Sequence, residues 1–183
     1  MKNNRAALAG VAVVVLLLAG WWLFKRGSGG QGSVDLIAQL QAAEKRPASG
    51  TFEVVDAELN GEKRRAIYTV PESRITWKVR VPDDAWLRVM VGMKPDSYTT
   101  EGDGVLFRVG VSDGRGYEPL FQQHVNPFTS TGDRKWIPVM VDLSAYAGEE
   151  VSLIFNTNNS APGAGDDDRN DFALWGTPEI ISK

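Results

Sequence analysis

The sequence predicts an all-β fold, a jelly-roll β-sandwich, behind one N-terminal transmembrane helix and a short amphipathic helix. Three observations predict it. Nineteen uncharged residues follow one another near the N-terminus. Apolar residues then recur every three positions over residues 33–46, and from about residue 50 they alternate with polar ones. The corresponding segments are residues 1–26 (tail and anchor), 27–49 (linker and short helix) and 50–183 (sandwich).

The uncharged run begins at Ala6 and ends at Phe24, with two basic residues on each side. At about 1.5 Å per residue, a helix of this length approaches the ~30 Å of a bilayer core. A cleaved leader usually has a shorter apolar part. Cleavage near Gly20 is the alternative, but Trp21 and Trp22 continue the run and favour the headgroup region. We therefore expect a retained single-pass helix in contact with membrane lipid.

Charge determines the expected orientation and compartment. The chain carries 20 Lys and Arg residues against 23 Asp and Glu residues, and its first 26 residues hold four basic residues and no acidic one. The remainder is therefore acidic, which argues against nucleic acid as a partner and against an anionic cytoplasmic leaflet. The absence of cysteine is compatible with an oxidising compartment. We expect a protein of the bacterial inner membrane, with a cytoplasmic N-terminus and a periplasmic C-terminal domain.

Residues 27–32 are rich in glycine and read as a flexible tether, and helix signals come directly after them. Ser33 can cap a helix, Asp35 suits its first turn, and Pro47 would end it. The apolar residue at every third position gives such a helix one stripe to bury. We expect a helix over residues 33–46 that docks on the neighbouring domain.

Short alternating segments fill the rest of the chain. A hairpin is predicted over residues 52–70, with its turn at Asn60 and Gly61, a pair that favours positive φ. Further strands are predicted over residues 74–81, 85–91, 105–111, 137–143, 151–155 and 172–175. Strands of this number and length, broken by Gly, Pro and Asp turns, indicate one sandwich or jelly-roll domain.

Residues 136–157, WIPVMVDLSAYAGEEVSLIFNT, resemble a segment of galactose-binding-like jelly-roll domains, the architecture of many carbohydrate-binding modules. In such domains a strand ends in Asp-Leu-Ser, a turn carries Tyr-Ala-Gly, and the next strand reads Val-x-Leu-x-Phe. The stretches VPDDAWLRVMVGM, GDGVLFRVGVSDG and DFALWGTPEI keep the same order, so the resemblance covers roughly residues 70–183. It implies the fold, which serves glycan, protein and nucleic-acid binding alike.

No catalytic set is recognisable in the sequence, and we do not expect an enzyme. His124 is the only histidine, the chain has no thiol, and no G-x-S-x-G sequence occurs. With Pro127 close behind it, His124 is expected in a loop rather than as a catalytic base. Adjacent acidic residues such as Asp83 and Asp84 are expected to be solvated in turns.

A structural calcium ion is the one cofactor that the sequence suggests. The segment over residues 156–171 is rich in oxygen ligands, which Ca²⁺ prefers, and it contains the candidate ligands Asp166 and Asp168. The resemblance adds that such jelly rolls often carry a structural calcium ion near the chain ends, with a late Glu as ligand. Glu179 is the residue at such a position.

Residues suited to sugar binding occur in segments predicted to be loops. Sugar C–H groups stack on aromatic rings, and sugar hydroxyls need polar partners. The candidate glycan site consists of Tyr98, Tyr117, Asn156, Asn158 and Asn159. The same residue types are also compatible with ordinary turns.

A second apolar face is predicted opposite the core. By alternation, several large or charged side chains of types enriched at protein interfaces point away from the core residues. They are Trp86, Arg88, Met90, Leu106, Arg108, Trp136, Met140 and Ile154. Either the helix over residues 33–46 or a long loop covers this face, or the face contacts a partner protein.

These patterns are compatible with two functions. The first is a non-enzymatic accessory subunit of an inner-membrane protein complex, for example a respiratory or photosynthetic one, whose sandwich contacts other subunits outside the cytoplasm. The alternative is a membrane-tethered, lectin-like module that binds cell-envelope or exogenous glycans. The apolar second face favours the first function, and the fold resemblance with the Asn- and Asp-rich segments favours the alternative.

Overall fold

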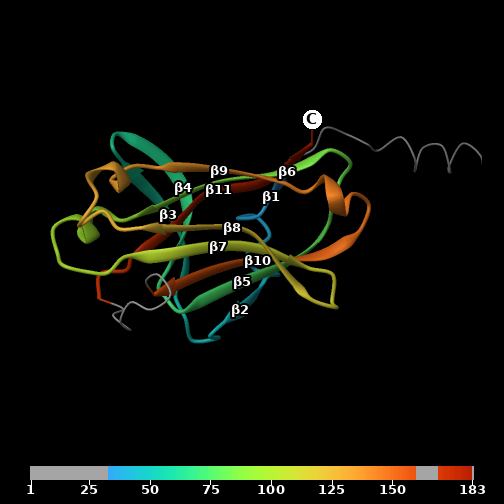
Figure 1. Cartoon of the computed structure of the whole chain (residues 1–183), viewed down its shortest axis with the longest axis horizontal. Helices are drawn as coiled ribbons and strands as arrows, with labels where there is room; N and C mark the ends of the chain where they lie inside the picture. The colour runs from blue at the N-terminus through green and yellow to red at the C-terminus, as the bar shows by residue number, and fades with distance from the viewer. Residues whose placement is uncertain (1–32, 160–168, 183) are drawn as a thin grey trace, which may run out of the picture. The chain divides into compact units, whose positions relative to one another are not determined.

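The computed structural model describes residues 33–159 and 169–182, which form two packed antiparallel sheets (Figure 1). Sheet A has the strand order β3-β4-β11-β6-β9, and β1 also pairs with β11. Sheet B has the order β2-β5-β10-β7-β8. The only helical elements among the described residues are short 3-10 helices. The prediction of an all-β sandwich is confirmed.

The strands are short, and residues along each one alternate between the inner and outer face of its sheet. Sheet A contains β1 (Val34–Asp35), β3 (Phe52–Leu59), β4 (Glu62–Thr69), β6 (Ala85–Met93), β9 (Ile137–Asp142) and β11 (Ala173–Ser182). Sheet B contains β2 (Glu44–Arg46), β5 (Ser73–Arg80), β7 (Val105–Ser112), β8 (Tyr117–Val125) and β10 (Glu150–Asn159). The 3-10 helices are η1 (Pro95–Tyr98), η2 (Thr131–Asp133) and η3 (Ser144–Tyr146).

The inner faces of the two sheets meet in one hydrophobic core with aromatic rings at its centre. The ring centroids of Trp77 and Phe155 are 4.9 Å apart, and those of Phe155 and Trp175 are 4.5 Å apart. Trp77 Nε1 donates to the carbonyl of Leu36 (3.1 Å), and Trp175 Nε1 donates to Thr157 Oγ1 (3.1 Å). Both buried indole N–H groups are therefore satisfied, so the rings can be buried without leaving an unpaired donor.

The prediction of a helix over residues 33–46 is wrong, because the structure has two short strands joined by turns there. β1 pairs with β11 of sheet A and β2 pairs with β5 of sheet B, so this segment joins the two sheets. Its turns are closed by i to i+3 hydrogen bonds, from Leu40 N to Ile37 O (3.1 Å) and from Ala43 N to Leu40 O (3.3 Å). The apolar period of three therefore reflects three-residue turns rather than an α-helix. We name residues 33–46 the N-terminal strap; its Leu36, Ile37 and Leu40 belong to the main core.

The predicted membrane anchor over residues 6–24 lies outside the described residues. Within residues 33–159 and 169–182, no helix is long and apolar enough to cross a membrane. The described residues belong to one compact unit that begins at Ser33.

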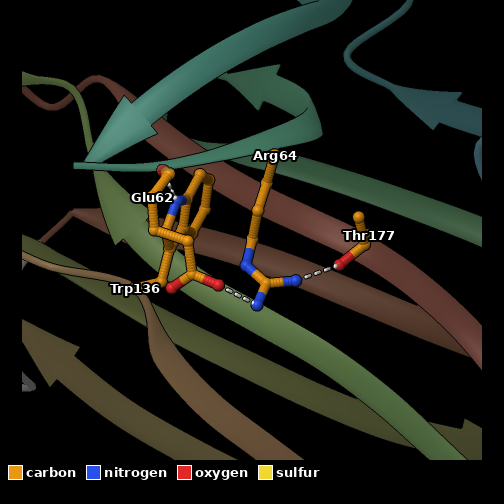
Figure 2. Close-up of polar contacts among 4 residues, drawn as sticks. All are labelled: Glu62, Arg64, Trp136 and Thr177. Atoms are coloured by element: carbon orange, nitrogen blue, oxygen red, sulfur yellow. Dashed lines mark hydrogen bonds and ion pairs between the residues drawn. The ribbon is translucent and has the colours of Figure 1, made fainter. Parts of the chain in front are cut away.

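The β3–β4 hairpin covers part of the outer face of sheet A. Figure 2 shows how the hairpin is attached: Trp136 Nε1 donates to the carbonyl of Glu62 (2.9 Å), and Arg64 Nη1 donates to Thr177 Oγ1 (3.1 Å). Arg64 also forms an ion pair with Glu62. These contacts join the hairpin to β11 and to the segment that leads into β9.

A second, smaller apolar cluster lies beneath the hairpin. Trp136 is 4 % exposed and packs with Leu59, Ala66 and Leu174. A Cβ added to Gly176 would lie 2.8 Å from the Trp136 ring, so the ring rests on that glycine. Of the two alternatives for the second apolar face, Trp136 therefore follows the first, cover by another part of the chain, and the cover is the hairpin rather than the strap. The hairpin turn itself has the predicted positive φ at Asn60 (49°).

Candidate functional site

The outer face of sheet B carries the candidate site. The strand register aligns one polar residue from each strand, which together form a row across the sheet. Directly opposed residues of an antiparallel ladder lie on the same side of a sheet. In Figure 1 the central strands β5, β10 and β7 run side by side in the lower layer. We name this set the polar row: Arg46 (β2), Arg74 (β5), Asn156 (β10), Arg108 (β7) and Gln122 (β8).

Arg74 and Asn156 are bonded to each other near the centre of the polar row. Arg74 Nε donates to Asn156 Oδ1 at 2.7 Å. Asn156 is buried, at 6 % exposed, whereas Arg74 is exposed. Because the bond uses Nε, it orients the planar guanidinium and leaves the Nη groups of Arg74 facing solvent.

Arg108 lies half-buried on β7, on the other side of Asn156. Its Nε is shielded from solvent and has no acceptor among the described residues. Its Cζ lies 6.0 Å from the centroid of the Tyr117 ring, within cation–π range. Arg108 thus places a partly desolvated positive charge beside an aromatic ring.

Tyr117 provides a flat surface next to the polar row. A Cβ added to Gly110 would lie 2.4 Å from Cε2 and Cζ of the Tyr117 ring, so the ring lies directly over the backbone of β7. Only glycine leaves room for this approach. The Tyr117 side chain is nevertheless 41 % exposed, and its other side faces solvent.

Two aliphatic side chains complete the outer face of sheet B. Leu106 on β7 and Ile154 on β10 are each 8 % exposed. They flank the polar row, Leu106 opposite Asn158 on one side and Ile154 opposite Gly110 on the other. The face therefore combines an exposed ring, oriented cations and two buried aliphatic side chains that flank them.

The candidate partner residues do not form the single face that was predicted. Leu106, Arg108 and Ile154 lie on the outer face of sheet B. Trp86, Arg88, Met90 and Met140 lie on the outer face of sheet A, and of these Met90 packs against the cluster of the buried Trp136. The prediction failed because alternation shows which side of its own sheet a residue occupies, but not which sheet that is.

A groove of about 390 Å³ adjoins the Tyr117 ring at the end of sheet B. Tyr146 Oη donates to Glu118 Oε2 in it, at 2.7 Å. Burial raises the pKa of Tyr146 to about 12, and the hydrogen bond to Glu118 and its negative charge act in the same direction. The pKa of Asp113, also in the groove, lies below its usual value, chiefly because the backbone N–H of Arg115 donates to it. The groove is lined by Val111, Asp113, Arg115, Gly116, Tyr117, Glu118, Tyr146 and Glu149.

Three of the predicted glycan residues lie apart from the polar row. Asn158 and Asn159 end β10, where the Glu72 carboxylate accepts bonds from the Asn158 side chain and from the Asn159 N–H (2.9 Å). Tyr98 ends η1, with Arg134 Cζ 5.6 Å from its ring centroid, and it packs against the small cluster at Trp136. The structure brings together only Tyr117 and Asn156 of the predicted set.

Several of these residues were predicted in loops, and that prediction is wrong. The three asparagines lie in β10, and Tyr117 and His124 lie in β8. His124 Nε2 is 2.8 Å from the carbonyl oxygen of Asp103. Sequence reasoning also missed Arg74, Gly110 and Gln122 as site residues. A glycine between Val109 and Val111 was the available signal, because glycine inside a strand often marks the close approach of another group.

The predicted calcium ligands are not gathered in the described part of the chain. Glu179 lies on β11, and its Oε1 accepts from Nε (2.9 Å) and Nη2 (2.6 Å) of Arg88. Asp166 and Asp168 lie outside the described residues. Over residues 33–159 and 169–182, no three Asp, Glu or His side chains are grouped so that they could hold a metal ion. The Glu179 carboxylate serves an ion pair between β6 and β11.

Comparison by sequence gives one relative. The chain matches no family model. An uncharacterized protein of Archaeoglobus fulgidus is 41 % identical over 105 residues, which are 56 % of this chain and 25 % of that protein. The match thus spans about a quarter of the relative's length.

Solved structures with a fold similar to that of this chain include carbohydrate-binding modules. The CBM51 of Clostridium perfringens GH95, solved with methyl-galactose, has a TM-score of 0.55 and 18 % identity and covers 82 % of this chain and 100 % of its own. The CBM22-2 xylan-binding domain of Paenibacillus barcinonensis Xyn10C has a TM-score of 0.52 and 9 % identity, and covers 84 % and 100 %. The chain therefore has the jelly-roll β-sandwich fold of carbohydrate-binding modules.

Proposed function

We propose that the chain is a non-catalytic glycan-binding module that binds through the outer face of sheet B. The observation that carries the proposal is the exposed Tyr117 ring, held flat on Gly110 with Arg108 beside it. The C–H groups of a sugar ring are weakly positive and stack on the negative face of an aromatic ring. Arg and Asn side chains next to the ring can bond the sugar hydroxyls. Both kinds of contact are available on one surface.

Proteins of the same fold support this proposal over the complex-subunit hypothesis. The neighbouring structures are described as bound to methyl-galactose and as xylan-binding. The complex-subunit hypothesis gains no support from these comparisons, and the β3–β4 hairpin buries Trp136, one of its largest candidate contacts. We therefore prefer the glycan-binding alternative.

Binding without catalysis fits the chemistry of the polar row. Glycoside hydrolysis typically uses two carboxyl groups placed on either side of the scissile bond. The polar row consists of arginines and amides, with no carboxyl group among its five residues. The one histidine of the chain contacts the Asp103 carbonyl and not the row.

We also propose that this module is tethered to the bacterial inner membrane by residues 6–24 and faces the periplasm. The length of the uncharged run and its flanking basic residues support this. Resistance to alkaline carbonate extraction is the expected result, and release into the soluble fraction would rule the tether out.

The proposed function is tested with the full chain on an array of neutral and acidic glycans. A detergent without a sugar headgroup is used, so that it does not compete. Binding to at least one glycan is expected, and titration calorimetry then measures the affinity for each glycan bound. Tyr117→Ala should weaken binding by about tenfold, because it removes the stacking surface.

The matched control is Phe128→Ala. Phe128 is 39 % exposed but lies outside sheet B, in the segment after β8. It should leave binding unchanged. Equal losses in both variants, or no binding to any glycan, would refute the proposed function.

A further inference from the structure

We infer that the glycan bound on sheet B is acidic, with a carboxylate of a uronic acid residue directed at Arg108 and Arg74. This inference rests on the proposed function and adds the class of ligand. It comes from the distribution of ion pairs among the described residues, which leaves the centre of one face without counter-charges.

Besides Arg46 of the edge strand β2, four cations share the outer face of sheet B: Arg74, Lys78 and Arg80 on β5 and Arg108 on β7. None of these four forms an ion pair with a carboxylate of the described residues. Such pairs do form on the edge strand of this face, as Arg46–Glu44, and elsewhere in the described chain, as Lys63–Glu58, Arg64–Glu62 and Arg88–Glu179. The face is thus a positive surface on a chain whose formal net charge is −3. Clustered charge of one sign attracts ligands of the other sign.

The carboxylates nearest to this face are placed at its edges. Glu44 is bonded to Arg46 on the edge strand β2. Glu72 is bonded to Asn158 beyond one end of the face, and Glu150 stands opposite Arg80 at the other end. The centre of the face, around Arg74 and Arg108, is left with hydrogen-bond donors and no acidic group.

Arg108 explains why this face should prefer a carboxylate at one position, and not only attract anions in general. It is half-buried and its Nε has no acceptor, so its charge is partly desolvated without a counter-charge. A charge in this state gains more from a bound anion than a fully hydrated one does. The planar Nη groups of an arginine match the two oxygens of a carboxylate.

Geometry places the carboxylate and the sugar ring together. Arg108 lies beside the Tyr117 ring. Within the polar row, Asn156 stands between Arg108 and Arg74, and it orients the Arg74 guanidinium. A uronic acid residue stacked on Tyr117 therefore presents its carboxylate to the Arg108 side of the ring. The arginines select the acidic sugar, and the tyrosine provides affinity that does not depend on charge.

The test measures binding of the full chain, at fixed physiological ionic strength, to oligogalacturonate, oligomannuronate and hyaluronan oligosaccharides. Each is compared with its carboxyl-reduced form, which keeps the sugar backbone and loses the charge. At least one acidic oligosaccharide should bind about tenfold or more tightly than its reduced form. Arg108→Gln should remove most of this difference in affinity. Arg108→Lys should leave an intermediate difference, because lysine keeps the positive charge but cannot bind a carboxylate through two parallel N–H groups.

The controls distinguish the possible failures. Arg65→Gln removes an exposed arginine of β4 and should have no effect, and thermal unfolding checks that each variant folds. Polyglutamate offers carboxylates without sugar, and equal binding to it would overturn the inference in favour of unspecific attraction. If reduced or neutral glycans bind as tightly as the acidic ones, the inference is wrong while the proposed function stands. If no glycan binds at all, the proposed function fails, and the inference fails with it.

Discussion

Gly110 determines whether Tyr117 can lie flat on sheet B. Gly110→Ala should weaken glycan binding about as much as Tyr117→Ala, because the new Cβ would occupy the position of the ring. The Tyr117 side chain is partly exposed and can swing aside, so the free energy of unfolding should change by less than about 1 kcal/mol. Calorimetric titration and denaturant unfolding separate the two effects.

Gly116→Ala is the matched control for this prediction. A Cβ at Gly116 meets nothing within 4 Å, in the turn between β7 and β8. It should leave binding intact. Retention of full affinity by Gly110→Ala would show that the position of the ring is unimportant.

Tyr146 should ionise at about pH 12, above its ordinary pKa of 10.0. Burial disfavours the phenolate, and ionisation would also lose the bond to Glu118 and set two negative charges together. Because the pKa is raised in the folded state, this stabilisation is complete below about pH 10 and is lost between about pH 10 and 12. Titration of the phenolate absorbance, with Tyr146→Phe to identify the step, measures this pKa.

Glu118→Gln tests the cause of the shift. Glutamine still accepts the hydrogen bond but carries no charge, so the pKa of Tyr146 should fall part of the way towards 10, since burial is unchanged. An unaltered titration curve in this variant would exclude any contribution from the charge of Glu118.

At the scale of elements, the β3–β4 hairpin depends on Trp136. Trp136→Ala should lower the free energy of unfolding by about 3–5 kcal/mol, because it leaves a cavity under the hairpin and removes the bond to the Glu62 carbonyl. Amide hydrogen exchange should increase over β3 and β4 first. Denaturant unfolding gives the size of the effect.

Met140→Ala is the control for the hairpin. It lies on the same side of sheet A but is 48 % exposed, so its loss should cost within about 0.5 kcal/mol. If Met140→Ala lowered the free energy of unfolding as much as Trp136→Ala does, the stability could not be attributed to packing under the hairpin.

Strand β8 shows why one element escaped prediction. Its residues, YEPLFQQHV, do not alternate cleanly, and Pro119 interrupts them. β8 is the edge strand of sheet B, and its ladder with β7 shifts between Val109 and Gly110, opposite Pro119. Proline is tolerated at an edge or a bulge because no inner hydrogen bond is lost there. β8 was therefore missed, because the prediction relied on the regular alternation that central strands show and β8 lacks.

For the whole molecule, the alternation of inner strands such as β6 and β7 was sufficient to predict a sandwich. Their inward residues, Val89 and Phe107 among them, are fully buried. The pairing of strands was not predictable, because residues far apart in the chain meet only through tertiary packing. The candidate site depends on such pairing: Arg74, Arg108 and Asn156 come from three different strands. Residue types could suggest Tyr117 and Asn156, but not that they share a face.

The N-terminal strap also determines how the module would bear a mechanical load. β1 runs antiparallel to the last strand, with Val34 opposite Ile180, so force applied to Ser33 and Ser182 pulls on neighbouring ends of the same ladder. This is an unzipping geometry, in which hydrogen bonds break one at a time at low force. Because β1 is two residues long, it yields first, while Leu36 and Leu40 still hold the strap in the core. Tension between these ends would thus be absorbed first at β1, before it reaches β2, which pairs with β5 and carries Arg46 of the polar row.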